Sequence, residues 1–316
     1  MTDEKEPAGI GRRGLLAAAT IAGAAVGALA AGVGRGGQAL AASGPAGMWT
    51  PVPVPPQAPA KEGLAELPGT RLWYWDTGGT GAPVIFLHAG TGSGHAWGYQ
   101  QPVFAKAGYR AIGYSRRGYL GSDAGDNSNP GVASEDLHAL IGVLGLDRVH
   151  LVAAAHGGYF AIDYTLSHPD KVRSLTVLSS LMGIQDADYK AVNARLRPKF
   201  FADLPHDFQE LGPSYRAGDP AGVEAWNKLT HDAIPGTRID PKLAHEITWA
   251  ALETIRVPTL LMTGDADLYT PPSLLRMQAG HIPHAQVEII PEAAHSANWE
   301  QPEIFNRLVL DFIAKH

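Results

Sequence analysis

Short apolar runs recur along most of the chain, and amphipathic segments separate them. The first clear run, Val84–Leu87, ends in a Gly-rich loop, and similar runs occur in segments 109–118, 148–158, 171–180, 257–267 and 285–295. Such runs are typical of strands buried on both faces of a parallel sheet. The intervening segments, and the last stretch of the chain, have helical spacing. The alternation predicts an α/β protein with a mostly parallel sheet.

Two segments do not follow this alternation of strands and helices. Residues 71–79 alternate and end in a turn, which predicts an antiparallel edge hairpin. Residues 183–255 are too long for a single crossover and contain several polar helical segments. We therefore expect a core built from residues 70–182 and 256–316, with residues 183–255 inserted as a helical lid.

The N-terminal segment has the features of an export signal. Arg12 and Arg13 precede a weakly apolar stretch, Leu15–Val33, and an Ala-Leu-Ala sequence at 39–41 follows. Residues 1–41 thus resemble a twin-arginine signal peptide. An uncleaved membrane anchor is the alternative, but the stretch is Ala/Gly-rich and only just long enough to span a bilayer. We expect a periplasmic or secreted protein without membrane contact after cleavage, in which residues 42–69 form a Pro-rich linker.

The composition excludes several kinds of partner and catalytic chemistry. The formal net charge of −6 disfavours a nucleic-acid partner, and the absence of cysteine excludes disulfides and thiolate catalysis. The 13 histidines include no H-E-x-x-H pattern, and the chain has neither a P-loop nor a dinucleotide fingerprint. We therefore predict no metal, no cofactor and a small-molecule ligand. The residues leave the oligomeric state open.

Four landmarks then occur in a fixed order. They are LHAGTGSG (87–94), YSRRGYLGSD (114–123), LVAAAHGG (151–158), and GDAD (264–267) together with EAAHSANWEQPEIFN (292–306). From about Thr70 to the C-terminus the chain resembles the α/β-hydrolase superfamily, in the branch of meta-cleavage-product hydrolases, enol-lactonases and cofactor-free perhydrolases. The resemblance implies a doubly wound, mostly parallel sheet carrying a catalytic triad.

The resemblance also implies roles for individual residues. Asp267 matches the acid that holds the catalytic imidazole in one tautomer, and His295 matches that histidine. The backbone N–H groups of Gly90 and His156 match the oxyanion hole, and they do not depend on a nucleophile's side chain. The order of nucleophile, acid and histidine along the chain also agrees with the family.

The nucleophile position is occupied by Ala155, so an acyl-serine intermediate at this site is excluded. One explanation is an engineered Ser→Ala inactivation, against which the retained export signal argues. A second is an enzyme in which His295 and Asp267 activate water, or abstract a substrate proton for C–C cleavage, without a covalent step. A third is a ligand-binding pseudoenzyme. Candidate replacement nucleophiles are Ser93, Ser115, Ser179 and Ser180.

Large side chains in and near the predicted lid indicate the character of the ligand. Trp226 and Phe208 lie in the lid, and Met182 directly precedes it. We expect these three side chains to line the pocket, which would favour an apolar, aromatic ligand. The leading hypothesis is therefore a hydrolase that cleaves a small ester, a lactone or a C–C bond.

Overall fold

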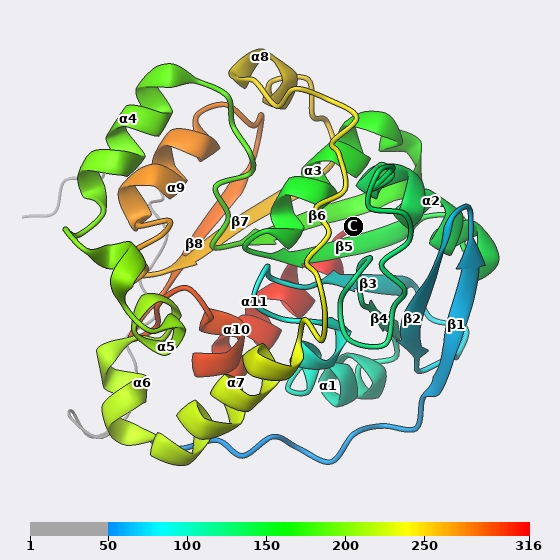
Figure 1. The fold of residues 1–316 in the computed structure, drawn as a ribbon, viewed down its shortest axis with the longest axis horizontal. Helices are drawn as coiled ribbons and strands as arrows, with labels where there is room; N and C mark the ends of the chain where they lie inside the picture. Colours follow the sequence, from blue (N-terminus) through cyan, green and yellow to red (C-terminus); the bar gives the residue numbers. More distant parts are fainter. Residues whose placement is uncertain (1–49) are drawn as a thin grey trace, which may run out of the picture. The chain divides into compact units, whose positions relative to one another are not determined.

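The computed structural model describes residues 50–316, which form a twisted eight-stranded sheet with helices on both faces (Figure 1). The strands are β1 (Lys61–Leu67), β2 (Thr70–Asp76), β3 (Pro83–Leu87), β4 (Arg110–Tyr114), β5 (Val149–Ala154), β6 (Val172–Leu178), β7 (Thr259–Gly264) and β8 (Gln286–Ile290). Their order is β1-β2-β4-β3-β5-β6-β7-β8. Only the β1–β2 and β2–β4 pairs are antiparallel. The predicted α/β class and mostly parallel sheet are therefore confirmed.

Two apolar clusters attach the helices to the sheet. The helices are α1 (Gln101–Lys106), α2 (Ala133–Val143), α3 (Gly157–Ser167), α4 (Ala187–Leu196), α5 (His206–Glu210), α6 (Pro213–Gly218), α7 (Pro220–Asp232), α8 (Trp249–Leu252), α9 (Pro272–Ala279), α10 (Ala297–Glu300) and α11 (Pro302–Ile313). Side chains of α2, α3 and α9 share one cluster with alternate strand residues. Those of α1 and α11 pack in the other. Strands buried on both faces explain the continuous apolar runs.

The predicted Pro-rich linker is too long at its C-terminal end. Residues 61–67 form β1, which pairs along its full length with β2. The strand buries Ala65 and Leu67 but leaves Leu64 exposed. Its Lys, Glu and Gly residues have low strand propensity, so the sequence did not predict a strand here. Pairing with β2 stabilises it as an edge strand. Residues 51–60 have no regular secondary structure.

Residues 183–255 contain α4 to α8 and connect β6 to β7. The predicted export signal, residues 1–41, lies outside the described residues. Among residues 50–316, no helix combines the length and the apolar character needed to cross a membrane.

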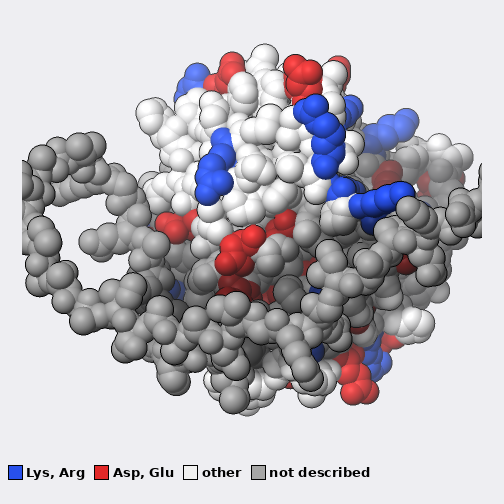
Figure 2. Space-filling model, turned by 90° about the vertical axis from the view of Figure 1, so that its left-hand side faces the viewer, with Lys and Arg blue, Asp and Glu red and all other residues white. Residues whose placement is uncertain are grey.

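Figure 2 shows basic and acidic side chains interspersed over the described part of one face.

Candidate active site

The turn between β5 and α3 keeps the geometry of a nucleophile elbow. Ala155 has φ 49°, in the left-handed region that costs a non-glycine residue about 1–3 kcal/mol. Its N–H donates to the Leu178 carbonyl at 2.8 Å. A Cβ on Gly157 would lie 2.3 Å from the Leu87 carbonyl oxygen, so only glycine fits there. The chain therefore retains the strained turn although position 155 has no hydroxyl.

The predicted catalytic pair of His295 and Asp267, called the dyad below, is in contact. His295 Nδ1 lies 3.0 Å from each carboxylate oxygen of Asp267, which also accepts bonds from Thr263 Oγ1 and from the N–H groups of Tyr269 and Thr270. Burial raises the pKa of Asp267, but His295 and the N–H groups of Tyr269 and Thr270 outweigh it and hold that pKa below 3.8. Burial lowers the pKa of His295, but the Asp267 charge prevails and keeps it above 6.5. Nδ1 thus carries a proton, and Nε2 makes no hydrogen bond to another described residue.

The predicted oxyanion donors are available. Neither the Gly90 nor the His156 N–H donates a hydrogen bond to any described residue. The loop that carries Gly90 is held by Arg116, whose guanidinium donates to the carbonyls of His88 and Ala89. Two free, preoriented N–H groups beside the elbow can stabilise a developing oxyanion.

A pocket of about 270 Å³ brings these groups together. It is lined by Gly90, Thr91, Ala155, His156, Tyr159, Ser179, Leu181, Arg197, Glu210, Arg238, Tyr269 and His295. Four of these residues belong to the sequence motifs, namely Gly90, Ala155, His156 and His295, and Asp267 contacts His295 directly. The charged side chains of Arg197, Glu210 and Arg238 come from the 183–255 insertion, belong to no motif and were not predicted.

The two missed arginines differ in their partners. The Arg238 guanidinium donates to His156 Nδ1 at 3.2 Å and to Asp240 at 2.9 Å. Burial, with the nearby arginines, lowers the pKa of His156 to about 3, so this imidazole is neutral. The Arg197 guanidinium carbon lies 4.7 Å from the centre of the Tyr269 ring. No acidic residue among those described pairs with Arg197.

The predicted apolar lining is wrong. Met182 is fully buried in the core cluster of the α2–α3 face. Phe208 is half exposed and stacks under the Arg216 guanidinium at 4.2 Å. Trp226 packs in a separate aromatic cluster with Trp299. None of these three side chains lines the pocket that contains His295, and Trp226 instead lines a small neighbouring pocket with Thr91 and Ser296. Their orientation depends on tertiary packing, which no periodicity in the sequence reveals.

The alternative serines are mostly occupied elsewhere. Ser93 accepts from the His95 N–H, Ser115 from the Gly94 N–H, and Ser180 from the Met182 N–H. Only Ser179 lines the pocket, and its buried hydroxyl makes no hydrogen bond to a described residue, including His295. No serine is therefore activated by the dyad.

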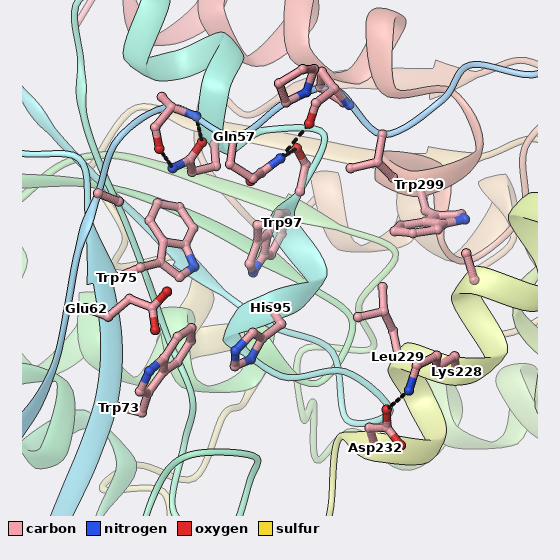
Figure 3. Close-up of a pocket in the computed structure, with 18 residues that line it drawn as sticks. Gln57, Glu62, Trp73, Trp75, His95, Trp97, Lys228, Leu229, Asp232 and Trp299 are labelled. Atoms are coloured by element: carbon pink, nitrogen blue, oxygen red, sulfur yellow. Dashed lines mark hydrogen bonds and ion pairs between the residues drawn. The ribbon is translucent and has the colours of Figure 1, made fainter.

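A second, larger pocket of about 920 Å³ lies apart from the dyad (Figure 3). Its aromatic lining consists of Trp73, Trp75, Trp97, Trp299 and His95. The Trp73 and His95 rings stack on each other at 3.9 Å. On the helix side, Lys228 pairs with Asp232 at 2.6 Å. None of the predicted catalytic residues lines this pocket, so the smaller polar pocket is the candidate active site.

The chain belongs to the alpha/beta hydrolase fold family, whose model matches residues 82–302. Among curated relatives, the 2-hydroxy-6-oxononadienedioate/2-hydroxy-6-oxononatrienedioate hydrolase of Paraburkholderia phymatum is 27% identical over 286 residues, covering 80% of this chain and 93% of the relative. Such relatives support a hydrolase-type function on a small molecule.

Solved structures agree on the fold. A thermophilic esterase from Thermogutta terrifontis superposes with a TM-score of 0.67 and 22% identity, covering 82% of this chain and 99% of the esterase. The enol-lactonase from Burkholderia xenovorans gives a TM-score of 0.63 and 19% identity, covering 80% and 100%. At these identities the likeness extends to the fold alone.

Proposed function

We propose that this chain is a hydrolase in which His295 and Asp267 activate water for direct attack on a small ester or lactone, without a covalent acyl-enzyme. The observation that carries the proposal is the juxtaposition of a free His295 Nε2 and two free N–H groups in one pocket, at an elbow that lacks a hydroxyl. Ala155 lines this pocket, whose volume of about 270 Å³ leaves room for a water molecule as well as part of a substrate.

The steps follow from the geometry. The neutral imidazole accepts a proton from water at Nε2 while the water oxygen bonds to the carbonyl carbon. Asp267 stabilises the imidazolium that forms, and the N–H groups of Gly90 and His156 receive the negative oxygen. The intermediate then collapses, the bond to the leaving oxygen breaks, that oxygen takes up a proton, and loss of the imidazolium proton restores the neutral His295.

Turnover of an ester and lactone panel, combined with intact mass spectrometry, tests this proposal. We expect hydrolysis with no acyl adduct on the quenched protein, because no nucleophile carries the acyl group. An adduct under turnover conditions would contradict direct water attack. Absence of hydrolysis, with saturable binding of the same compounds, would support the pseudoenzyme alternative.

The lining also indicates the charge of the substrate. Arg197 and Arg238 both face the pocket, and Arg197 has no acidic partner among the described residues. We infer a polar substrate that carries a negative group, in place of the apolar ligand expected from the sequence. The dioate in the Paraburkholderia relative's name is of this chemical class.

Replacing Arg197 with glutamine should raise KM for an anionic ester by about 10- to 100-fold, because a charge-assisted hydrogen bond contributes about 1.5–3 kcal/mol. The comparison uses 4-nitrophenyl hemisuccinate and the neutral 4-nitrophenyl butyrate, whose KM should change little. Arg195→Gln is the matched control, since Arg195 lies exposed in the last turn of α4 and Arg197 is the residue that directly follows this helix. Equal changes for both esters would rule out an anion-binding role.

We further propose that the protein acts outside the cytoplasm, exported by the twin-arginine segment of residues 1–41. The Arg12-Arg13 pair and the absence of cysteine support this. Substitution of both arginines by lysine should leave the full-length precursor inside the cell, which fractionation and immunoblotting would detect.

A further inference from the structure

Glu210 is a buried acid that belongs to no family motif. It is the last residue of α5, is 4% exposed, and lines the pocket together with Ala155 and His295. A buried carboxyl without a cationic partner is costly, so such a group in a reaction pocket requires an explanation. No Lys or Arg among the described residues forms an ion pair with it.

Two loops of the active site hold the Glu210 carboxyl in place. Oε2 accepts from Thr91 Oγ1 at 3.1 Å and from Ser296 Oγ at 3.4 Å. Thr91 follows the oxyanion donor Gly90, and Ser296 follows His295. The main-chain carbonyl of Glu210 also accepts from the Ser296 N–H at 3.0 Å. The carboxyl is thus fastened between the oxyanion loop and the histidine loop.

The other oxygen is free. Both hydrogen bonds of the carboxyl involve Oε2, and Oε1 has no partner among the described residues. The neighbouring Gln209 accepts a hydrogen bond from the Tyr269 hydroxyl and donates to the main-chain carbonyls of residues 201, 202 and 204, which restrains the end of α5. Oε1 is therefore available to a group bound in the pocket.

We propose that Glu210 is a second catalytic residue, the general acid that donates its Oε1 proton to the leaving oxygen of the substrate. This rests on the proposed direct attack by water. The water proton goes to His295 Nε2, the new C–O bond forms, and the bond to the leaving oxygen then breaks as that oxygen takes the Glu210 proton. Transfer of the imidazolium proton to the carboxylate restores the enzyme, and the products are one acid and one alcohol.

The electrostatics agree with a protonated carboxyl. Burial raises the pKa of Glu210 above 4.5, although the charge of His295, the Thr91 hydrogen bond and His206 act in the opposite direction. Asp267 adds to the increase. The other charged groups lining the pocket are Arg197 and Arg238.

Leaving-group dependence distinguishes an acid from a structural residue. Glu210→Gln should lower kcat/KM for ethyl butyrate by about 100-fold or more, because an alkoxide needs a proton. The loss on 4-nitrophenyl butyrate should stay below about tenfold, because nitrophenolate leaves unaided. The bell-shaped pH profile of the wild type on ethyl butyrate should become a single rise to a plateau, since only the neutral His295 is then required.

Glu300→Gln is the matched control. Glu300 is equally buried, but it accepts from the Gly212 and Ala294 N–H groups and does not line the pocket. Its substitution should affect both esters equally. Equal losses on both esters in Glu210→Gln would overturn the assignment while leaving direct water attack intact. Absence of wild-type turnover on every ester would overturn both.

An infrared titration gives a second readout that needs neither turnover nor the Glu210→Gln variant. Burial raises the pKa of Glu300 to about 8, so the titration is made in the Glu300→Gln background, which should still show a protonated carboxyl C=O band that disappears as Glu210 ionises. Thr91→Val removes a donor that favours the ionised form, so the band should persist to higher pH in that variant. A band unaffected by Thr91→Val, or no such band, would contradict a proton on Glu210.

Discussion

Replacing His295 with alanine should lower kcat by about 10²- to 10⁴-fold, the usual contribution of a positioned general base. The reason is structural: Nε2 of His295 is the free basic nitrogen of the dyad in the pocket, and Asp267 fixes its tautomer at 3.0 Å. The measurement is initial rates on the ester panel, with circular dichroism and a thermal melt to show that the variant folds.

His284→Ala is the matched control. His284 is a histidine outside the pocket, it lies between α9 and β8, and we expect its substitution to leave kcat unchanged. Equal turnover by the wild type and by His295→Ala would contradict the mechanism in which His295 and Asp267 activate water. A binding protein, by contrast, would keep its affinity in His295→Ala and show no turnover in either form.

Replacing Ala155 with serine should convert a protein that fluorophosphonates do not label into one that takes up about one label per chain. The left-handed turn at residue 155, the dyad and the free N–H groups are all in place, so the new hydroxyl completes a triad. Labelling is measured by intact mass, and pre-steady-state kinetics should change from linear to a burst.

Two controls accompany this variant. Ala155→Gly relieves the left-handed strain, which is worth about 1–3 kcal/mol, yet adds no hydroxyl and should not be labelled. Labelling of the wild type that disappears in Ser179→Ala would identify Ser179 as the nucleophile and contradict direct water attack. A rise in kcat of about 10³-fold in Ala155→Ser would favour the alternative of a serine hydrolase that has lost its nucleophile.

The dyad and oxyanion donors were predictable because each follows a strand directly. In a parallel sheet the carboxyl ends of neighbouring strands converge, so short motifs after β3, β5, β7 and β8 meet at one edge whatever lies between them. The structure confirms that Gly90, Ala155, His156 and His295 line one pocket. Arg116 holds the oxyanion loop through the carbonyls of His88 and Ala89, a contact that depends on the tertiary structure.

The sequence by itself determined the fold class, the strand-end motifs and the loss of the nucleophile, since these depend on local patterns and on strand topology. The tertiary structure alone decided the character of the pocket. Glu210, Arg197 and Arg238 enter it from the 183–255 insertion, while Phe208 and Trp226 of the same insertion point elsewhere. Short helices joined by irregular loops orient their side chains through packing, and packing is a long-range property that no local pattern encodes.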